Sequence, residues 1–251
     1  MIGGSPCTFW SCAKGAKREV DKSGVGWLLF SRFTDAVQIV RPKWYLYENV
    51  ASMPNTIKAY ISEAFGIEPI EINSALVSAQ QRKRYYWTNI NGIQQPEDRG
   101  ILLKDILQSG LPMTDKSYCV TARYNGAELR NSLERKQRSM VFTPVRIGEI
   151  GNGGQGLRIY SVRGKSVCLS AGGGGGGAST GLYKIDLPDD DYYVRKLTPI
   201  EAERCQTLPD SYTAFGTDSN GYRVKISDAQ RYKGIGNGWT VDVIAHILSY
   251  I

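Results

Sequence analysis

Three short segments of the chain carry side chains that can do covalent chemistry. Cys7 lies in a Gly-Ser-Pro-Cys turn, Glu48 begins a Glu-Asn-Val run, and Arg82 and Arg84 lie in a Gln-Gln-Arg-Lys-Arg run. A thiolate is a nucleophile, a carboxyl group can donate a proton, and a guanidinium group can hold a developing negative charge. Each segment alone has an ordinary explanation, since a lone cysteine is usually structural and a basic run usually faces solvent. Their combination is what indicates a catalytic site.

The segments around these residues predict an α/β architecture. Apolar residues at helical spacing predict helices over residues 29–40 and 57–65, and β-rich runs predict strands at residues 1–4, 44–47, 67–72 and 85–88. Because strands alternate with helices, we expect a parallel sheet. The carboxyl ends of parallel strands and their adjoining loops meet at one crevice, so the thiol, carboxylate and guanidinium groups would converge there.

The composition changes near residue 109. From there to about residue 193 the chain is rich in Gly, Arg, Lys and Ser and lacks helical periodicity, which predicts a separate lobe of loops and β-ribbons, with a β-like run at residues 158–162. Glycine-rich runs at 151–156 and 172–177 are not followed by Lys-Ser/Thr, so a phosphate-binding loop is not expected. They are either flexible surface loops or loops whose bare backbone approaches a ligand, and their basic surroundings favour the second.

Helical order returns at Thr198. Thr198-Pro199-Ile200-Glu201 is a capping box with proline at the first helical position. Residues 239–251 predict a last helix with one apolar face, which leaves His246 on the opposite, exposed face with no catalytic role.

The bulk composition narrows the classes of protein. A net charge of +7 and a pI near 9.1 indicate an anionic partner, most often nucleic acid, or else a merely basic protein. Five scattered cysteines and one histidine argue against a disulfide framework and a metal site and fit a reducing cytosol. There is no run of about 18 apolar residues and no secretion signal at the start, so we expect no membrane span and a cytoplasmic location.

Five segments resemble, in order, the motifs of the cytosine-5 DNA methyltransferases, of the phage and bacterial type related to the eukaryotic de novo enzymes. Residues 3–7 resemble the nucleophile loop, 48–50 the ENV motif, 77–87 the QxRxR motif, 195–210 the segment that buttresses the recognition lobe, and 234–239 the final motif, which returns to the methyl-donor site. The match covers nearly the whole chain outside the middle lobe. Five motifs in family order argue strongly against coincidence.

The resemblance implies methyl transfer from S-adenosylmethionine to carbon 5 of cytosine. Carbon 5 is a poor nucleophile, and addition of the Cys7 thiolate at carbon 6 makes it enamine-like. Glu48 would supply the acid at ring nitrogen 3, Arg84 would hold the exocyclic oxygen, and Arg82 would support the loop or a phosphate. Because carbon 6 is inaccessible inside a duplex, the resemblance also implies double-stranded DNA with a flipped cytosine.

The resemblance also implies a domain plan: a partial Rossmann-like methyltransferase sheet in residues 1–108 and 194–251, and a target-recognition lobe in residues 109–193. The implied methyl-donor contacts are Pro6, Asn237, Gly238 and Trp239. Candidate DNA contacts are Gln80, Arg123, Arg130, Arg135, Lys136 and Arg138. The implied setting is a bacterial or phage-infected cell, as in restriction–modification.

Two features depart from the family pattern. Thr8 follows the nucleophile where the family usually has Gln or Asn, and no strand–glycine–helix unit that would bind most of the donor precedes Cys7. The chain is therefore interpreted as one half of a split enzyme completed by a partner polypeptide, as a fragment, or as a degenerate relative. The retained motif residues favour the first two. In either case, exposed apolar sheet surface would make the isolated chain poorly stable or dependent on a partner.

Two other functions remain open. One is methyl transfer to cytosine in RNA, since a branch of the family acts on tRNA, and the other is a non-catalytic DNA-binding or regulatory subunit. The long basic lobe favours DNA over tRNA, and the retained thiol, acid and arginines favour catalysis.

Overall fold

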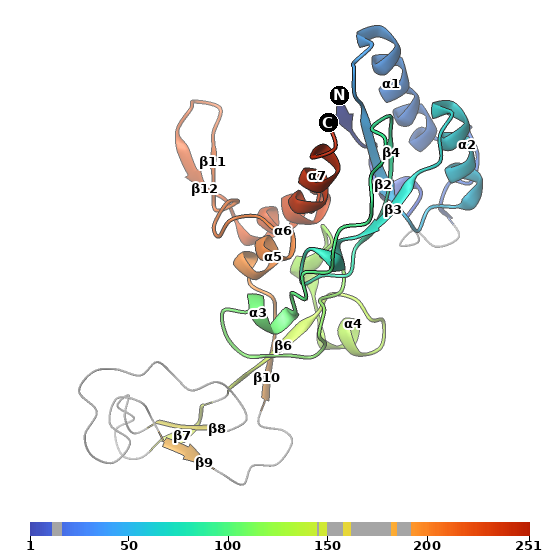
Figure 1. Ribbon diagram of the computed structural model, residues 1–251. Helices are drawn as coiled ribbons and strands as arrows, with labels where there is room; N and C mark the ends of the chain where they lie inside the picture. Colours follow the sequence, from blue (N-terminus) through green and yellow to red (C-terminus); the bar gives the residue numbers. More distant parts are fainter. Residues whose placement is uncertain (12–16, 145, 150–157, 162–181, 185–191) are drawn as a thin grey trace. The chain divides into compact units, whose positions relative to one another are not determined.

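The computed structural model describes residues 1–11, 17–144, 146–149, 158–161, 182–184 and 192–251 (Figure 1). The chain divides into two compact units. Unit 1 comprises residues 1–77, 81–100 and 241–251, and unit 2 comprises residues 78–80 and 101–240. This division differs from the predicted one, because residues 101–108 and 194–240 lie in the same unit as the predicted recognition lobe.

Unit 1 is built on a four-stranded mixed sheet with the order β1-β2-β4-β3. Its strands are β1 (Ile2–Gly3), β2 (Leu46–Val50), β3 (Ile70–Asn73) and β4 (Lys83–Thr88). Only β1 and β2 are parallel, whereas β4 runs antiparallel to both β2 and β3. The prediction of a parallel sheet is therefore wrong for β4. The connection from β3 to β4, residues 74–82, is too short for the crossover that parallel strands need.

Two helices cover one face of this sheet: α1 (Val25–Val40) and α2 (Asn55–Phe65) (Figure 1). Phe30 from α1 and Ile57 from α2 pack in one buried cluster with Tyr47 and Trp87 of the sheet. Both predicted helices are confirmed. The first extends back to Val25, since the Glu19 carboxylate accepts the N–H of Gly26 at 2.9 Å and satisfies one of the unpaired donors of its first turn.

The chain's last helix, α7 (Val241–Leu248), also belongs to unit 1. Arg99 forms an ion pair with Asp242 at its start. His246 lies half-buried rather than exposed, with Nε2 2.9 Å from the carbonyl oxygen of Gln94. The histidine therefore helps to hold α7 against residues 90–100 of the same unit.

Unit 2 combines short helices with small sheets that are antiparallel except for the β8–β9 pair. The strands are β5 (Leu111–Pro112), β6 (Met140–Pro144), β7 (Arg146–Glu149), β8 (Arg158–Ser161), β9 (Leu182–Lys184), β10 (Tyr192–Lys196), β11 (Phe215–Thr217) and β12 (Arg223–Lys225). The helices are α3 (Leu103–Ile106), α4 (Leu129–Leu133), α5 (Pro199–Cys205) and α6 (Asp228–Asn237). Pairing of β6 with β10 and of β7 with β8 confirms the predicted ribbons. The two glycine-rich runs lie outside the described residues.

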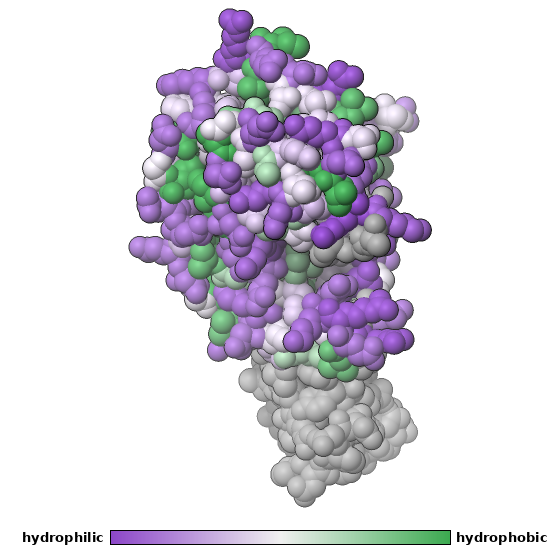
Figure 2. Space-filling model, turned by 90° about the vertical axis from the view of Figure 1, so that its right-hand side faces the viewer, coloured by the Kyte–Doolittle hydropathy of each residue, from purple (hydrophilic) through white to green (hydrophobic). Residues whose placement is uncertain are grey.

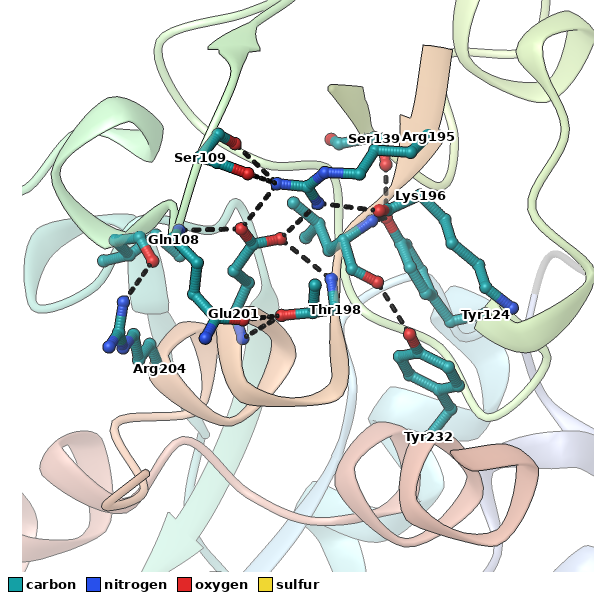
Figure 3. A network of polar contacts seen from close by, with 12 residues as sticks. Gln108, Ser109, Tyr124, Ser139, Arg195, Lys196, Thr198, Glu201, Arg204 and Tyr232 are labelled. Carbon is teal, nitrogen blue, oxygen red and sulfur yellow. Dashed lines mark hydrogen bonds and ion pairs between the residues drawn. The ribbon is translucent and has the colours of Figure 1, made fainter. Parts of the chain in front are cut away.

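A polar network at the start of α5 organises unit 2 (Figure 3). The predicted capping box is confirmed, since Thr198 Oγ1 accepts the N–H of Glu201 and Glu201 Oε2 accepts the N–H of Thr198. Glu201 is fully buried and also receives both terminal nitrogens of Arg195 at 2.8 Å. Its Oε1 accepts the N–H of Gln108 as well. This carboxylate therefore joins β10, α5 and the segment after α3.

Exposed apolar side chains occur among polar ones, as Figure 2 shows for one face. On α1 they include Leu28, Ile39 and Val40, which are 52%, 81% and 61% exposed. Among the described residues, no helix is both long and apolar enough to cross a membrane.

Candidate active site

The segment that carries Cys7 is packed directly on strand β2. The chain leaves β1 through Gly4, Ser5 and Pro6 and enters a single 3-10 turn, Cys7–Phe9. A Cβ atom at Gly4 would lie 2.7 Å from the carbonyl oxygen of Glu48, so this position requires glycine. The Cys7 side chain is a free, half-buried thiol, and it packs with Phe9 against the core of unit 1.

Two side chains of β2 hold this segment in place. Asn49 Nδ2 donates to the carbonyl oxygen and to Oγ of Ser5, at 3.2 and 3.3 Å, and also to the hydroxyl oxygen of Tyr47. The Tyr47 hydroxyl lies 2.6 Å from Ser5 Oγ. Burial raises the pKa of Tyr47 to about 12, so the phenol stays neutral at ordinary pH. The backbone two residues before the thiol is therefore tied to the strand that carries Glu48.

Glu48 and Arg84 form an ion pair across the β2–β4 ladder. Arg84 Nε lies 2.9 Å from Glu48 Oε1, and the two side chains are 13% and 12% exposed. Arg84 also donates through a terminal nitrogen to the carbonyl oxygen of Lys83. The pair is thus oriented from both sides while one edge of it still meets solvent.

The antiparallel register explains why these residues meet. Glu48 faces Tyr86 and Val50 faces Arg84, so Arg84 is the diagonal neighbour of Glu48 on the same face. The prediction placed all three functional groups at the carboxyl ends of parallel strands. The structure instead brings the beginning of β4 beside the end of β2. The convergence of acid and arginine is confirmed, but by a different geometry.

Arg82 lies deeper, at the junction between β3 and β4. Only 4% of this residue is exposed. Its N–H donates to Asn73 Oδ1 and its carbonyl oxygen accepts the N–H of Ser74, both at 3.0 Å. This is the position of a residue that supports the connection before β4, which was one of its two predicted roles.

The other described cysteines differ from Cys7. Cys205 is fully buried in the core of unit 2, and burial raises the pKa of its thiol to about 12. A thiol so rarely ionised is a poor nucleophile. Cys119 is half-buried in unit 2, where its sulfur lies 3.7 Å from the carbonyl oxygen of Val120. Of these three cysteines, Cys7 is the one in the same unit as Glu48 and Arg84.

The structure places Gln80 inside unit 2 and not at a surface. Gln80 is 0% exposed. Its Nε2 donates to the carbonyl oxygen of Cys205 and to Gln206 Oε1, and its Oε1 accepts the N–H of Val120. Every polar atom of its side chain is thus engaged within the core. The prediction that Gln80 contacts DNA is corrected, because its side chain has no exposed atom to offer and its hydrogen bonds all lie within unit 2.

The residues predicted to contact the methyl donor fall in both units. Pro6 is exposed in unit 1, whereas Asn237, Gly238 and Trp239 follow one another at the end of α6 in unit 2. Gly238 caps α6 through its N–H and accepts a hydrogen bond from Gln206 Nε2 at 3.4 Å. Asn237 is exposed and Trp239 is half-buried. Gln206, which accepts a hydrogen bond from Gln80, therefore also holds this segment.

The predicted DNA-contacting cations all lie in unit 2. Arg123, Arg135 and Lys136 are exposed, and exposed Arg130 pairs with Glu134 at 2.7 Å. Arg138 is half-buried and donates to the carbonyl oxygen of Gly126. Apart from Arg138, these cations extend into solvent.

Sequence reasoning missed Tyr47 and Asn49 as positioning residues. A signal was available, since residues 47 and 49 alternate with Glu48 and therefore share the opposite face of the strand. Their partner, Ser5, is two residues before the thiol, but nothing in the sequence shows that it lies on that face.

Comparison with known proteins identifies the family. The whole chain, residues 1–251, matches the family described as C-5 cytosine-specific DNA methylase. It is 30% identical over 271 residues to the type II methyltransferase M.HhaI of Haemophilus parahaemolyticus, which covers 98% of this chain and 73% of the relative.

Among solved structures, the chain is similar to a proposed DNA modification methyltransferase encoded within an E. coli prophage. The identity is 17%, the TM-score is 0.49, and the match covers 99% of this chain and 77% of the other. The similarity of the sequence is the stronger result of the two. The chain belongs to the C-5 cytosine-specific DNA methylase family and is a DNA cytosine methyltransferase.

Proposed function

We propose that this chain methylates carbon 5 of a flipped cytosine in double-stranded DNA, with Cys7 as the covalent nucleophile. The observation that carries the proposal is the Glu48–Arg84 ion pair at 2.9 Å, formed on the strand to which Asn49 ties the Cys7 segment. A free thiol, an acid and an arginine are thus held within one compact unit. The family assignment supplies DNA cytosine as the substrate.

In the proposed reaction the Cys7 thiolate forms a bond to carbon 6. The displaced electron pair moves toward ring nitrogen 3, where Glu48 supplies a proton, and carbon 5 gains enamine character. Arg84 holds the exocyclic oxygen and keeps Glu48 oriented. After carbon 5 has been alkylated, a base removes its proton, the electron pair restores the ring double bond, Cys7 leaves as thiolate, and the proton at ring nitrogen 3 returns to Glu48.

The methyl donor that the family uses is S-adenosylmethionine, which supplies an electrophilic methyl group when bound. The exposed Asn237 amide and the half-buried Trp239 indole are groups suited to a polar, aromatic ligand of this kind. We propose that Pro6 and residues 237–239 contact the methyl donor.

Two further expectations stay with this proposal. The sheet of unit 1 is inferred to be part of a Rossmann-like methyltransferase sheet. Arg123, Arg130, Arg135, Lys136 and Arg138 are inferred to bind DNA phosphates or groove edges as part of a recognition lobe. A cytoplasmic location stays a prediction.

Covalent trapping tests the nucleophile. A duplex with 5-fluorocytosine at the target position cannot lose its carbon-5 substituent as a proton, so the methylated adduct should persist on a denaturing gel. We expect the adduct with the parent chain in the presence of S-adenosylmethionine and its absence with Cys7→Ser. Cys119→Ser, a thiol of similar exposure in unit 2, is the matched control and should retain it.

A second readout separates the nucleophile from the donor pocket. Reversible addition of Cys7 at carbon 6 lets carbon 5 exchange its hydrogen with water, and this requires no methyl donor. DNA labelled with tritium at cytosine carbon 5 should therefore release tritium with the parent chain but not with Cys7→Ser. If the parent chain forms no adduct and releases no tritium, the catalytic proposal is overturned and a non-catalytic DNA-binding role is left.

A further inference from the structure

The β11–β12 hairpin of unit 2 presents cations and an aromatic ring on one face. Phe215 pairs with Lys225 and Thr217 pairs with Arg223 across the ladder, so all four side chains lie on the same side. All four residues are exposed. The Arg223 guanidinium carbon lies 3.9 Å from the centre of the Phe215 ring, which holds the cation in a fixed place over the aromatic surface.

The tip of the hairpin is preorganised by its single acidic residue. Asp218 Oδ1 accepts the N–H groups of Asn220 and Tyr222 at 2.9 and 2.8 Å. The N–H of Asp218 donates to the carbonyl oxygen of Tyr222, and Gly221 adopts a φ of +85°. The carboxylate is thus used by its own turn, and the tip places Tyr222, 71% exposed, in solvent.

The base of the hairpin is held by a buried carboxylate. Glu203 Oε1 accepts hydrogen bonds from the N–H of Thr213, just before β11, and from a terminal nitrogen of Arg231 in α6, at 2.8 and 3.0 Å. Glu203 is 0% exposed. On the opposite face of the hairpin, Ile226 packs where a Cβ at Gly216 would lie 2.9 Å away. The cationic face therefore has a fixed direction relative to α5 and α6.

These features distinguish the hairpin from an ordinary solvated loop. Phe215 and Tyr222 remain 49% and 71% exposed although the ribbon around them is ordered by hydrogen bonds. Exposed aromatic rings interleaved with cations are typical of surfaces that bind nucleic acid. A two-stranded ribbon is also one of the few elements narrow enough to enter the major groove of B-form DNA.

We propose that the β11–β12 hairpin is a second DNA-binding element, separate from the basic residues 123–138, and that it grips the duplex outside the reacting base. Arg223 and Lys225 bind phosphates, while Phe215 and Tyr222 pack against sugars or base edges. The proposal rests on the proposed function for its ligand, double-stranded DNA. Because phosphate contacts carry no sequence information, this element sets affinity and register and leaves base choice to other residues.

Salt-dependent DNA binding tests the proposal. The whole chain carrying Cys7→Ser, which cannot form the adduct, is titrated with a fluorescent duplex of about 30 base pairs over a range of salt concentrations. Adding Arg223→Gln and Lys225→Gln should lower the magnitude of the slope of log K against log salt by about 1.8, and weaken binding roughly tenfold near 0.15 M salt. Phe215→Leu should weaken binding about threefold with the slope unchanged, since a ring and not a charge is lost.

A matched pair of charge changes serves as the control. Arg32→Gln with Lys104→Gln also removes two positive charges, but from exposed helical positions outside the hairpin. This control should leave the slope unchanged and alter the affinity by no more than about twofold. Circular dichroism melting confirms that every variant folds. An unchanged slope in the hairpin variant, or no duplex binding by the parent at low salt, would overturn the proposal.

Two outcomes separate this proposal from its neighbours. If the hairpin variant keeps its DNA affinity but loses self-association in sedimentation, the face binds a second copy of the chain, and the DNA proposal is wrong. Tritium exchange measured at saturating DNA reports on the addition of Cys7 to the ring and not on the affinity for DNA. No exchange by the parent chain, together with a salt slope that is reduced by Arg223→Gln and Lys225→Gln, would therefore overturn the proposed catalysis and leave the hairpin proposal standing.

Discussion

Unit 1 and unit 2 each contain glutamate–arginine pairs that join separate elements, and the pairs differ in how completely the carboxylate is enclosed, while their arginines are 11% to 16% exposed. In unit 2, Glu201 and Glu203 are 0% exposed, and their carboxylates also accept backbone N–H groups. In unit 1, Glu48 and Arg84 keep 12% and 13% exposure on the strand next to the Cys7 segment. A carboxylate enclosed on all sides stabilises architecture, whereas one with an open edge can still exchange a proton with a substrate.

The largest effect should come from removing the acid of the open pair. Glu48→Gln keeps the shape of the side chain but cannot protonate ring nitrogen 3, so we expect methyl transfer to fall about 10²- to 10⁴-fold in single-turnover assays. The free energy of unfolding should fall by about 1 to 2 kcal/mol, less than in the fully buried pair of unit 2, because Glu48 keeps some contact with solvent. Glu71→Gln on the same sheet, which breaks the exposed pair with Lys83, is the control and should leave transfer unchanged. Full activity in Glu48→Gln would remove the acid from the mechanism.

The enclosed pair should show the opposite pattern. Glu201→Gln leaves the Arg195 guanidinium without its counter-charge and should lower the free energy of unfolding by about 3 kcal/mol in urea denaturation. The release of tritium from cytosine carbon 5, which depends on Cys7, should be unchanged per folded molecule. Glu134→Gln, which breaks the exposed pair with Arg130 in the same unit, should cost at most about 0.5 kcal/mol. Equal losses in both variants would mean that enclosure is not what distinguishes these pairs.

Acid should reduce the stabilisation that the buried Glu203 carboxylate provides at the base of the hairpin. Burial alone would raise the pKa of Glu203, but hydrogen bonds from Thr213 and Arg231 outweigh it and hold the pKa below its ordinary value of 4.5. The stabilisation is therefore complete above pH 4.5 and is lost as the pH falls through the lowered pKa. The melting temperature should fall less steeply in Glu203→Gln than in the parent as the pH is lowered from about 6 to about 3, the range in which carboxyl groups titrate. Parallel curves would contradict this assignment.

The smallest effect should come from loosening the Cys7 segment. Tyr47→Phe removes the hydroxyl that contacts Ser5 and Asn49 and should cost about 1 kcal/mol of stability. We expect a loss of transfer rate of about fivefold, because the thiol is less well positioned. Tyr45→Phe, at the position directly before β2, is the matched control and should preserve the rate. An unchanged rate in Tyr47→Phe would mean that Asn49 alone positions the segment.

The sequence alone determined the residues of the candidate site and the local elements beside them. Helical spacing predicted α1 and α2, and Thr198 with Glu201 predicted the start of α5, because these signals depend on residues only three or four positions apart. The motifs around Cys7, Glu48 and Arg84 likewise predicted the chemistry and identified the family, since they depend on residue type and order.

Only the tertiary structure decided how these parts meet. The direction of β4 depends on the short connection from β3, and this placed Arg84 beside Glu48 through antiparallel pairing. The burial of Gln80 depends on Val120, Cys205 and Gln206, partners far away in the chain. Tyr47 and Asn49 became positioning residues only because the backbone of Ser5 lies over their face of the strand. Such contacts join residues that no local periodicity connects, so the folded chain alone could reveal them.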